Sequence, residues 1–351
     1  MLLTATRVVA VIESLPISIG LFVSAALVIA IVATQMTAIA DRLADKTGLG
    51  EALVGALFLG GSTSLAGLVT CITAAALGHA ELAISNALGG IAAQTVFLAI
   101  ADITYLKANL EHAAASAATL TQVALLLTLL AIPLVAMAGP DVNVFGIHPA
   151  SFLLVATYVF GLQLVSEAQT TPMWGPKHTA ETCLDVPDSA QIGDPGLAVL
   201  WFQFVVAAVI IAVAGYVVAE SGVAITNHTG LSETVVGGLF TAVCTALPEL
   251  VTSVAAVQRG ALTLAVSGII GGNCFDVLLV AFSDFAYRPG SIYHAITTSQ
   301  IFMISLNMLM LAVLLLGLLR REKHGIGNIG FESFLILILY LGGFLLLFYQ
   351  N

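Results

Sequence analysis

The sequence predicts an all-α membrane protein with ten transmembrane helices, arranged as two inverted repeats of five helices each. One observation is composition: hydrophobic residues make up 59% of the 351 residues and charged residues only 9%, against about 25% in soluble domains. The other is a repeat at a constant offset along the chain. A chain with so little polar surface belongs in the lipid bilayer, which is its first expected partner.

Ten apolar runs are long enough to cross a bilayer, which takes about 20 residues per helix. We place the spans at residues 15–40, 52–76, 83–103, 116–138, 150–168, 196–219, 233–257, 262–285, 293–318 and 331–349. A polar segment with four prolines, residues 169–195, joins the two halves. The predicted domains are therefore a first repeat at 1–168, a linker at 169–195 and a second repeat at 196–351.

Basic residues fall mainly on one side of this topology. Arg7 and Arg288 lie on the side of the termini, and eight lie on the opposite side: Arg42, Lys46, Lys107, Lys177, Arg259, Arg320, Arg321 and Lys323. Cytoplasmic loops are enriched in Lys and Arg. Both termini are therefore predicted to be extracytoplasmic, and the linker 169–195 to be cytoplasmic.

The composition also excludes several classes of protein. Ten Lys and Arg against twenty Asp and Glu give a net charge of −10, which argues against nucleic-acid binding. The sequence contains neither HExxH nor GxSxG, and its histidines lie in loops or near span ends. We therefore expect no enzyme and no cofactor. No repeated selectivity filter or charge ring indicates a channel.

The repeat has an offset of 182 residues. TGLGEALVGALF at 47–58 matches TGLSETVVGGLF at 229–240, and the alignment runs without a gap through 47–105 and 229–287. Of the 59 aligned residues 23 are identical. Five spans, an odd number, separate equivalent positions, so the halves enter the membrane with opposite topology. Inverted-repeat transporters bind their substrate near the midplane where the repeats meet, so these segments are expected to form the site.

The second repeat carries a carboxylate in mid-span. Glu249 lies in TALPELVTS, where an ionisable group costs at least about 2.5–3.5 kcal/mol. Pro248 lacks an amide proton and is expected to free carbonyl oxygens around Cys244 and Thr245. Thr245 shares a helix face with Glu249. Carboxylate, hydroxyl and carbonyl oxygens together suit a hard cation such as Ca²⁺ or Na⁺.

Further polar residues lie in the repeated segments. Asp276 lies deep in SGIIGGNCFDVLLV, with Asn273 one turn earlier, and Thr63 and Ser64 stand in the first repeat. Asp276, like Glu249, is interpreted mainly as a cation ligand. For Thr63, Ser64 and Asn273, hydrogen bonding between helices is an equal alternative to cation binding.

These residues resemble a known family. TALPELVTS followed by GIIGGNCFD is similar to the second alpha-repeat of the calcium/cation antiporter superfamily, the sodium/calcium exchanger family. The resemblance covers both repeats, and the ten-span, termini-out topology is like that of prokaryotic members. It implies a sodium/calcium exchanger-like fold in a prokaryotic inner membrane and secondary active cation antiport by alternating access. Carried over to this sequence, its ligands are Thr63, Ser64, Thr245, Glu249, Asn273 and Asp276, with Gln94 as a changed ligand.

The first repeat departs from the family pattern. Gly67 stands opposite Glu249, where the family usually has a second glutamate, and Gln94 stands opposite Asp276. Gly90 and Gly272 match serines that help to bind Na⁺ in the family. Na⁺/Ca²⁺ exchange is the first expectation. Ca²⁺/H⁺ or Na⁺/H⁺ exchange and a transport-inactive membrane scaffold are the alternatives.

Overall fold

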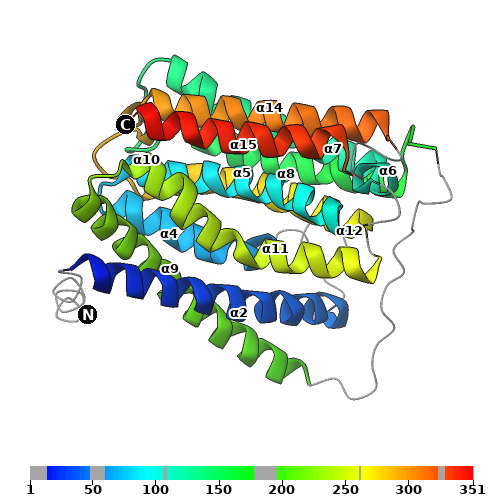
Figure 1. The fold of residues 1–351 in the computed structure, drawn as a ribbon, viewed down its shortest axis with the longest axis horizontal. Helices are drawn as coiled ribbons and strands as arrows, with labels where there is room; N and C mark the ends of the chain where they lie inside the picture. The colour runs from blue at the N-terminus through cyan, green and yellow to red at the C-terminus, as the bar shows by residue number, and fades with distance from the viewer. Residues whose placement is uncertain are drawn as a thin grey trace.

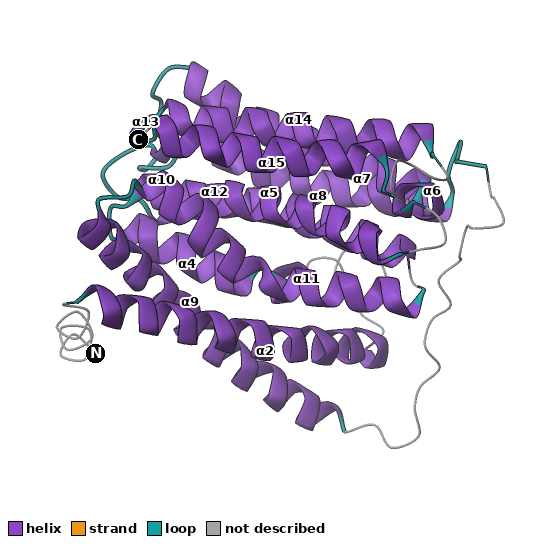
Figure 2. Cartoon of the chain, viewed as in Figure 1, coloured by secondary structure: helices purple, strands orange, loops and turns teal. Residues whose placement is uncertain are grey.

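The chain folds into a bundle of long helices. The computed structural model describes residues 14–47, 60–105, 109–177, 196–260, 262–322 and 329–350. Those residues are almost all helical and form no strand beyond one isolated bridge (Figure 2). Among them, nine helices are long and apolar enough to cross a membrane. The predicted all-α membrane fold is confirmed.

Both halves contain the same order of helices. The first half comprises α2 (Leu15–Thr47), α4 (Leu65–Ala76), α5 (Ala80–Thr104), α6 (Leu110–Ala114), α7 (Ala117–Ala138) and α8 (Pro149–Thr170). The second half comprises α9 (Leu197–Thr229), α10 (Glu233–Val235), the π-helix η1 (Val236–Thr241), α11 (Ala242–Arg259), α12 (Leu262–Ala286), α13 (Ile292–Ala295), α14 (Thr298–Arg320) and α15 (Phe331–Gln350). Helices α9 and α12 begin and end 182 residues after α2 and α5. The offset therefore relates whole halves, beyond the segments where the sequence match is visible.

The two halves interlock. Helices α2 and α9 pack along one another and run in opposite directions at the lower edge of Figure 1. Helix α5 of the first half packs against α14 and α15 of the second, while α12 packs against α7 and α8. Each central helix is thus covered by the last two helices of the other half, as expected for two inverted repeats.

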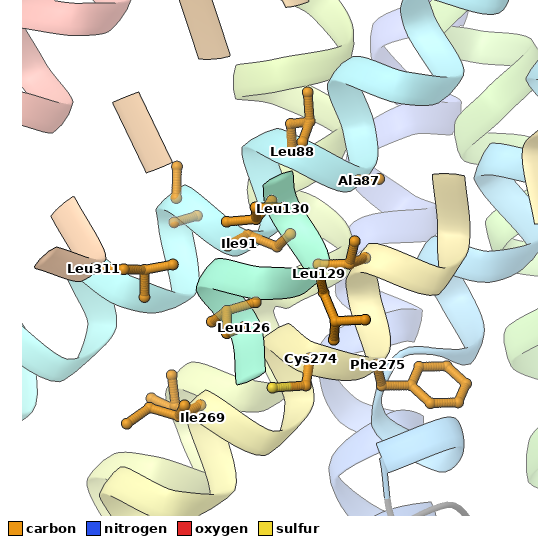
Figure 3. Close-up of a cluster of buried hydrophobic side chains, with 14 of the residues drawn as sticks. Ala87, Leu88, Ile91, Leu126, Leu129, Leu130, Ile269, Cys274, Phe275 and Leu311 are labelled. Atoms are coloured by element: carbon orange, nitrogen blue, oxygen red, sulfur yellow. The ribbon is translucent and has the colours of Figure 1, made fainter. Parts of the chain in front are cut away.

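Burial separates the central helices from the peripheral ones. Almost all of the apolar part of α5 is buried, whereas most of that of α2 is not. Side chains of α5, α7, α12 and α14 meet in one buried cluster, in which Ile91 and Leu126 lie between Leu311 and Phe275 (Figure 3). Helix α5 is therefore enclosed by protein, while α2 exposes apolar side chains as a lipid-facing helix does.

Some predicted boundaries are wrong. Helices α2 and α9 continue to Thr47 and Thr229, past the predicted ends at 40 and 219, because a helix can run beyond the apolar part of its sequence. The span predicted at 293–318 is divided: α13 ends at Ala295, and α14 begins after a capping box formed by Thr297 and Gln300. Of the span predicted at 52–76, residues 52–59 lie outside the described residues.

Most basic residues of the described ranges lie at one end of the bundle. Lys46 lies in the last turn of α2, Arg320 in the last turn of α14, and the Arg321 guanidinium donates to the carbonyl oxygen of Lys177. The start of α2 and the end of α15 lie at the opposite end (Figure 1). The cytoplasmic location of the basic end stays a prediction.

Candidate cation site

The two central helices meet through a pair of polar side chains. Gln94 lies near the middle of the 25-residue helix α5, and Asp276 lies near the middle of the 25-residue helix α12. Gln94 Nε2 donates a hydrogen bond of 2.6 Å to Asp276 Oδ2. Glycines beside them make room, since a Cβ at Gly90 would lie 3.8 Å from Asp276 Oδ2 and one at Gly272 3.4 Å from Gln94 Oε1. Small residues allow this close approach of helices.

A small buried cavity lies next to this pair. It has a volume of about 10 Å³, which is roughly the space that one water molecule needs. Residues of α4, α5, α11 and α12 form its wall: Ser64, Gly67, Asn86, Ala87, Gly90, Gln94, Thr245, Ala246, Glu249, Asp276 and Leu279. The cavity therefore lies between elements of both repeats.

Three of the four carboxylate oxygens in this wall lack a hydrogen-bond partner among the described residues. Both oxygens of Glu249 and the Oδ1 atom of Asp276 are buried without a partner among the described residues. Among the described residues, no Lys, Arg or His lines the cavity. A buried carboxylate needs a compensating charge or hydrogen-bond donor. The arrangement is suited to hold a cation or a proton between the two groups.

Neutral oxygen groups complete the wall. The Ser64 hydroxyl is buried and has no hydrogen-bond partner within the described ranges, and the Thr245 hydroxyl donates to the carbonyl of Ala242 at 3.2 Å. Oxygen atoms of carboxylates, hydroxyls and amides are the ligands that hard cations prefer. The site thus offers hard-cation ligands from both repeats.

The structure brings together five of the seven residues predicted from sequence: Ser64, Gln94, Thr245, Glu249 and Asp276 line the cavity. Thr63 lies just outside this lining, and its hydroxyl donates to the carbonyl of Gly60 at 3.0 Å. Asn273 Nδ2 donates to Thr95 Oγ1 at 3.3 Å. Asn273 is therefore placed in a contact between helices, the alternative interpretation of this residue.

Sequence reasoning missed Asn86. Its Oδ1 accepts a hydrogen bond from Thr241 Oγ1 at 2.7 Å, and its Nδ2 donates to Cys71 Sγ at 3.2 Å. A Cβ added at Gly67 would lie 3.8 Å from Asn86 Nδ2 and 3.7 Å from Thr245 Oγ1. The Asn86 amide thus lies beside the space left by the missing side chain of Gly67. The one indication in the sequence was that Asn86 is a polar residue within the apolar run LAISNALGG.

The π-helix η1 was also missed. Gly237 and Gly238 of η1 pack so tightly on α5 that a Cβ at Gly89 would collide with the Gly238 carbonyl. Thr241, the last residue of η1, then reaches Asn86. Short π-helical segments within α-helices are frequent at functional sites. The irregularity precedes α11, which continues through Pro248.

A comparison with protein families identifies the fold of these two repeats. The family profile described as sodium/calcium exchanger protein matches residues 17–166 and 199–350. The chain belongs to the sodium/calcium exchanger family. The resemblance of the sequence motifs to this family is confirmed. The two matched regions correspond to the two halves of the bundle.

Two curated relatives of this exchanger-family chain match over part of their length. The inner membrane protein YrbG of Escherichia coli K12 is 31% identical over 142 residues, which are 40% of this chain and 42% of YrbG. CaxA of Alkalimonas amylolytica, named as a putative antiporter, is 34% identical over 118 residues, which are 33% of this chain and 37% of CaxA. The chain therefore matches less than half the length of each relative.

Solved structures with the same fold match nearly end to end. The H⁺/Ca²⁺ exchanger CAX has a TM-score of 0.65 at 13% identity, covering 93% of this chain and 82% of CAX. YfkE has a TM-score of 0.61 at 15% identity, covering 97% and 98%. The sodium-calcium exchanger NCX_Mj, soaked with Na⁺ and Sr²⁺, has a TM-score of 0.58 at 17% identity, covering 93% and 98%. The predicted sodium/calcium exchanger-like fold is confirmed.

Proposed function

We propose that this chain is a secondary active cation antiporter whose cation binds in the cavity between Glu249 and Asp276. The observation that carries the proposal is the pair of buried carboxylates with oxygens that no described residue satisfies, placed where two inverted repeats meet. Substrate sites of inverted-repeat transporters lie at that place. Glu249 and Asp276 would be the main ligands, with Ser64, Thr245 and Gln94 beside them.

Alternating access would be produced by movement of the outer layer over the core. Helices α2 and α9 pack on each other, α9 packs on α4, and α2 packs on α11 (Figure 1). Rocking of this pair would open the cavity first to one side of the membrane and then to the other. We place the protein in a prokaryotic plasma membrane, which its bacterial relatives support. The distribution of its basic residues supports an extracytoplasmic position for both termini.

Na⁺/Ca²⁺ exchange is the first candidate for the transported ions, because the motifs of the second repeat follow that family. With Glu249 and Asp276 both ionised, two carboxylates face the cavity, and Gly67 adds none. Without the second glutamate that the family usually has at the position of Gly67, the site should bind Ca²⁺ less tightly, because Ca²⁺ affinity rises with the number of charged ligands.

Cation/H⁺ exchange is the second candidate, favoured by a specific observation. Glu249 has two buried oxygens without partners in the described part of the chain, and Ala246, Gly90 and Gly272 supply no hydroxyl to the cavity. A proton on Glu249 would neutralise its charge and provide a donor when no metal cation is bound. Protons and metal cations would then compete for one site.

Flux in reconstituted vesicles tests the proposal. Gradients of Na⁺, Ca²⁺ and H⁺ are imposed in turn on the same preparation, with wild type and Glu249→Gln compared. Loss of a charge-assisted interaction of about 1.5–3 kcal/mol should weaken cation binding roughly 10- to 100-fold. Glu167→Gln is the matched control, because Glu167 lies near the end of α8, away from the cavity. Wild-type flux from a folded Glu249→Gln protein would contradict the assignment of the site, and no cation binding by wild type would favour the scaffold alternative.

A further inference from the structure

Three more carboxylates lie buried at the end of the bundle away from the termini. Asp102 lies at the end of α5, Glu111 in the short helix α6, and Glu332 in the first turn of α15. Each is at most 1% exposed. We refer to Asp102, Glu111 and Glu332 as the acidic cluster. None of the three lines the cavity at Glu249 and Asp276.

Asp102 is satisfied by the backbone around it. Its Oδ1 accepts a hydrogen bond of 2.7 Å from the Leu110 amide, and its Oδ2 accepts one of 3.2 Å from the Gly330 amide. Two backbone donors stabilise a charged carboxylate. Asp102 therefore ties the start of α6 and the residue before α15 to the end of α5.

Glu111 and Glu332 are not satisfied. The Ser333 hydroxyl donates to Glu111 Oε1 at 3.4 Å, but Glu111 Oε2 and both oxygens of Glu332 are buried without a partner among the residues that the structure describes. A slot formed by Gly317 and Gly330 holds the Glu332 side chain, because a Cβ at either glycine would collide with it. The Glu332 side chain is thus tightly enclosed, and neither of its oxygens has a hydrogen-bond donor among the described residues.

Two basic side chains of this end, Arg320 and Arg321, are engaged elsewhere. Arg320 pairs with Glu322 at 3.2 Å and stacks over the ring of Phe331. The Arg321 guanidinium donates to the carbonyl oxygens of His112 and Lys177. In the described part of the chain, no basic side chain forms an ion pair with Glu111 or Glu332. The remaining charged group that faces Glu332 there is Glu322, also a carboxylate.

The second half of the protein has an equivalent carboxylate, Asp284, with the same kind of backbone hydrogen bonds, but it lacks the other two carboxylates. Asp284, the counterpart of Asp102, accepts from the Ile292 amide at 3.1 Å and from the His148 amide at 2.8 Å. Ser151 Oγ donates to Asp284 at 2.7 Å and lies 2.9 Å from the Tyr293 hydroxyl. By the 182-residue offset, Tyr293 corresponds to Glu111 and Ser151 to Ser333. A neutral hydroxyl thus stands where the first half has Glu111.

The residue equivalent to Glu332 in the other repeat also lacks a carboxylate. This residue is Ala150, which has no polar side chain. The equivalent positions therefore hold three carboxylates in the acidic cluster but only one, Asp284, at the other end of the bundle. Three adjacent charges in a buried place are strongly unfavourable unless one is neutralised. Burial and the charges of Asp102 and Glu332 raise the pKa of Glu111, in α6 outside the spanning helices, well above its ordinary value.

We propose that Glu111 and Glu332 share one proton, which makes the acidic cluster a proton-binding site separate from the cavity. An ionised carboxylate only accepts hydrogen bonds, whereas a protonated one also donates. One proton would therefore supply the missing donor and reduce the repulsion. A metal ion fits less well, because no group of three His, Cys, Asp or Glu side chains among the described residues is arranged as a metal site. Release of the proton to solvent would push α6 and α15 apart.

Infrared spectroscopy of the purified full-length protein tests this directly, since protonated carboxyl groups absorb apart from ionised ones. At neutral pH, Glu111→Gln and Glu332→Gln should each lose one protonated carboxyl group per chain, and the double variant should also lose one. Glu322→Gln, the control at the same end, should lose none. An unchanged count in all variants would mean that both carboxylates are charged and would overturn the proposal. Loss of two groups in the double variant would overturn the sharing of one proton.

Thermal unfolding gives a second readout. A carboxyl group with a raised pKa in the folded state stabilises the fold at low pH, and this stabilisation disappears as pH rises through the folded pKa. The melting temperature of wild type should therefore fall over that range, and Glu111→Gln should fall less. An equal slope in both proteins would contradict the proposal. Neither experiment requires transport, so the outcome is independent of the function proposed for the cavity.

Discussion

Gln94 donates a hydrogen bond to Asp276, the residue that occupies its own position in the other repeat. The two side chains are 182 residues apart, and Gln94 Nε2 lies 2.6 Å from Asp276 Oδ2. The axis that relates the repeats therefore passes close to this bond. At the axis the two halves differ chemically, because one contributes an amide and the other a carboxylate. This difference gives the site one carboxylate at a position where a symmetric protein would have two.

Exchanging these two side chains should preserve their contact. We expect the double variant Gln94→Asp with Asp276→Gln to melt near wild type, because amide and carboxylate change places across the axis. Gln94→Leu removes the donor and leaves Asp276 Oδ2 unsatisfied, which should destabilise the protein by about 1–3 kcal/mol. Melting temperatures in detergent measure both. If the exchanged protein melts no higher than Gln94→Leu, the surroundings of the two positions are not equivalent.

The sequence predicted the features that depend on one-dimensional patterns. Apolar runs identify the spans because a helix must stay apolar across the bilayer, and the constant offset identifies the inverted repeat. Glu249 and Asp276 stand out because a carboxylate in mid-span requires a compensating role. All of this can be read without knowing which helices touch.

The features that sequence missed depend on contacts between distant segments. Asn86 owes its position to Thr241 of a π-helix, and nothing in the local pattern indicates that irregularity. Glu111 and Glu332 are 221 residues apart and lie at helix starts, where a carboxylate is ordinary. Asn273 and Asp276 are one turn apart, yet only Asp276 lines the cavity. Which residues of a helix line the cavity depends on how that helix is rotated about its own axis, and the sequence alone does not show that rotation.

Gly67→Glu should increase the preference of the site for divalent cations. A Cβ at Gly67 would lie 3.4 Å from Leu279 and 3.7 Å from Thr245 Oγ1, so a side chain there can enter the cavity without a collision at Cβ. A second glutamate adds a negative ligand, which favours Ca²⁺ over Na⁺. Calorimetric titration of both ions measures the affinity ratio. Gly67→Ala is the control for added volume, and an equal ratio in both variants would show that the carboxylate does not reach the ion.

Gly89→Ala should disrupt the packing that brings η1 to α5. A Cβ at Gly89 would collide with the backbone carbonyl of Gly238, which cannot move as a side chain can. Overpacking of this kind typically costs about 1–3 kcal/mol. Gly268→Ala is the matched control, because no atom of the described residues lies within 4 Å of the Cβ it would add. The melting temperature should fall for Gly89→Ala and hold for Gly268→Ala. Equal melting temperatures would mean that η1 and α5 are not in close contact.

At the end of the bundle near the termini, a histidine is hydrogen-bonded to a carboxylate. His79, the residue before α5, places Nδ1 2.5 Å from Glu233 Oε1, and Glu233 Oε2 accepts from the Leu82 amide at 3.2 Å. The hydrogen bond to Glu233, and then the charges of Glu233 and Glu220, raise the pKa of His79 above its ordinary value, against the effect of burial. Glu81, in the first turn of α5, adds negative charge to the same end.

This pair should make stability depend on pH near neutrality. A histidine with a raised pKa in the folded state binds its proton more tightly there than in the unfolded chain, where the pKa is about 6.5. Its stabilisation is therefore complete below about pH 6.5 and is lost as pH rises through the folded value. The melting temperature of wild type should fall over that interval, while His79→Gln, which cannot be charged, should lack this part of the slope. His228→Gln, at an exposed histidine in the last turn of α9, is the control and should keep it. A wild-type slope that survives in His79→Gln would assign the titration to another group.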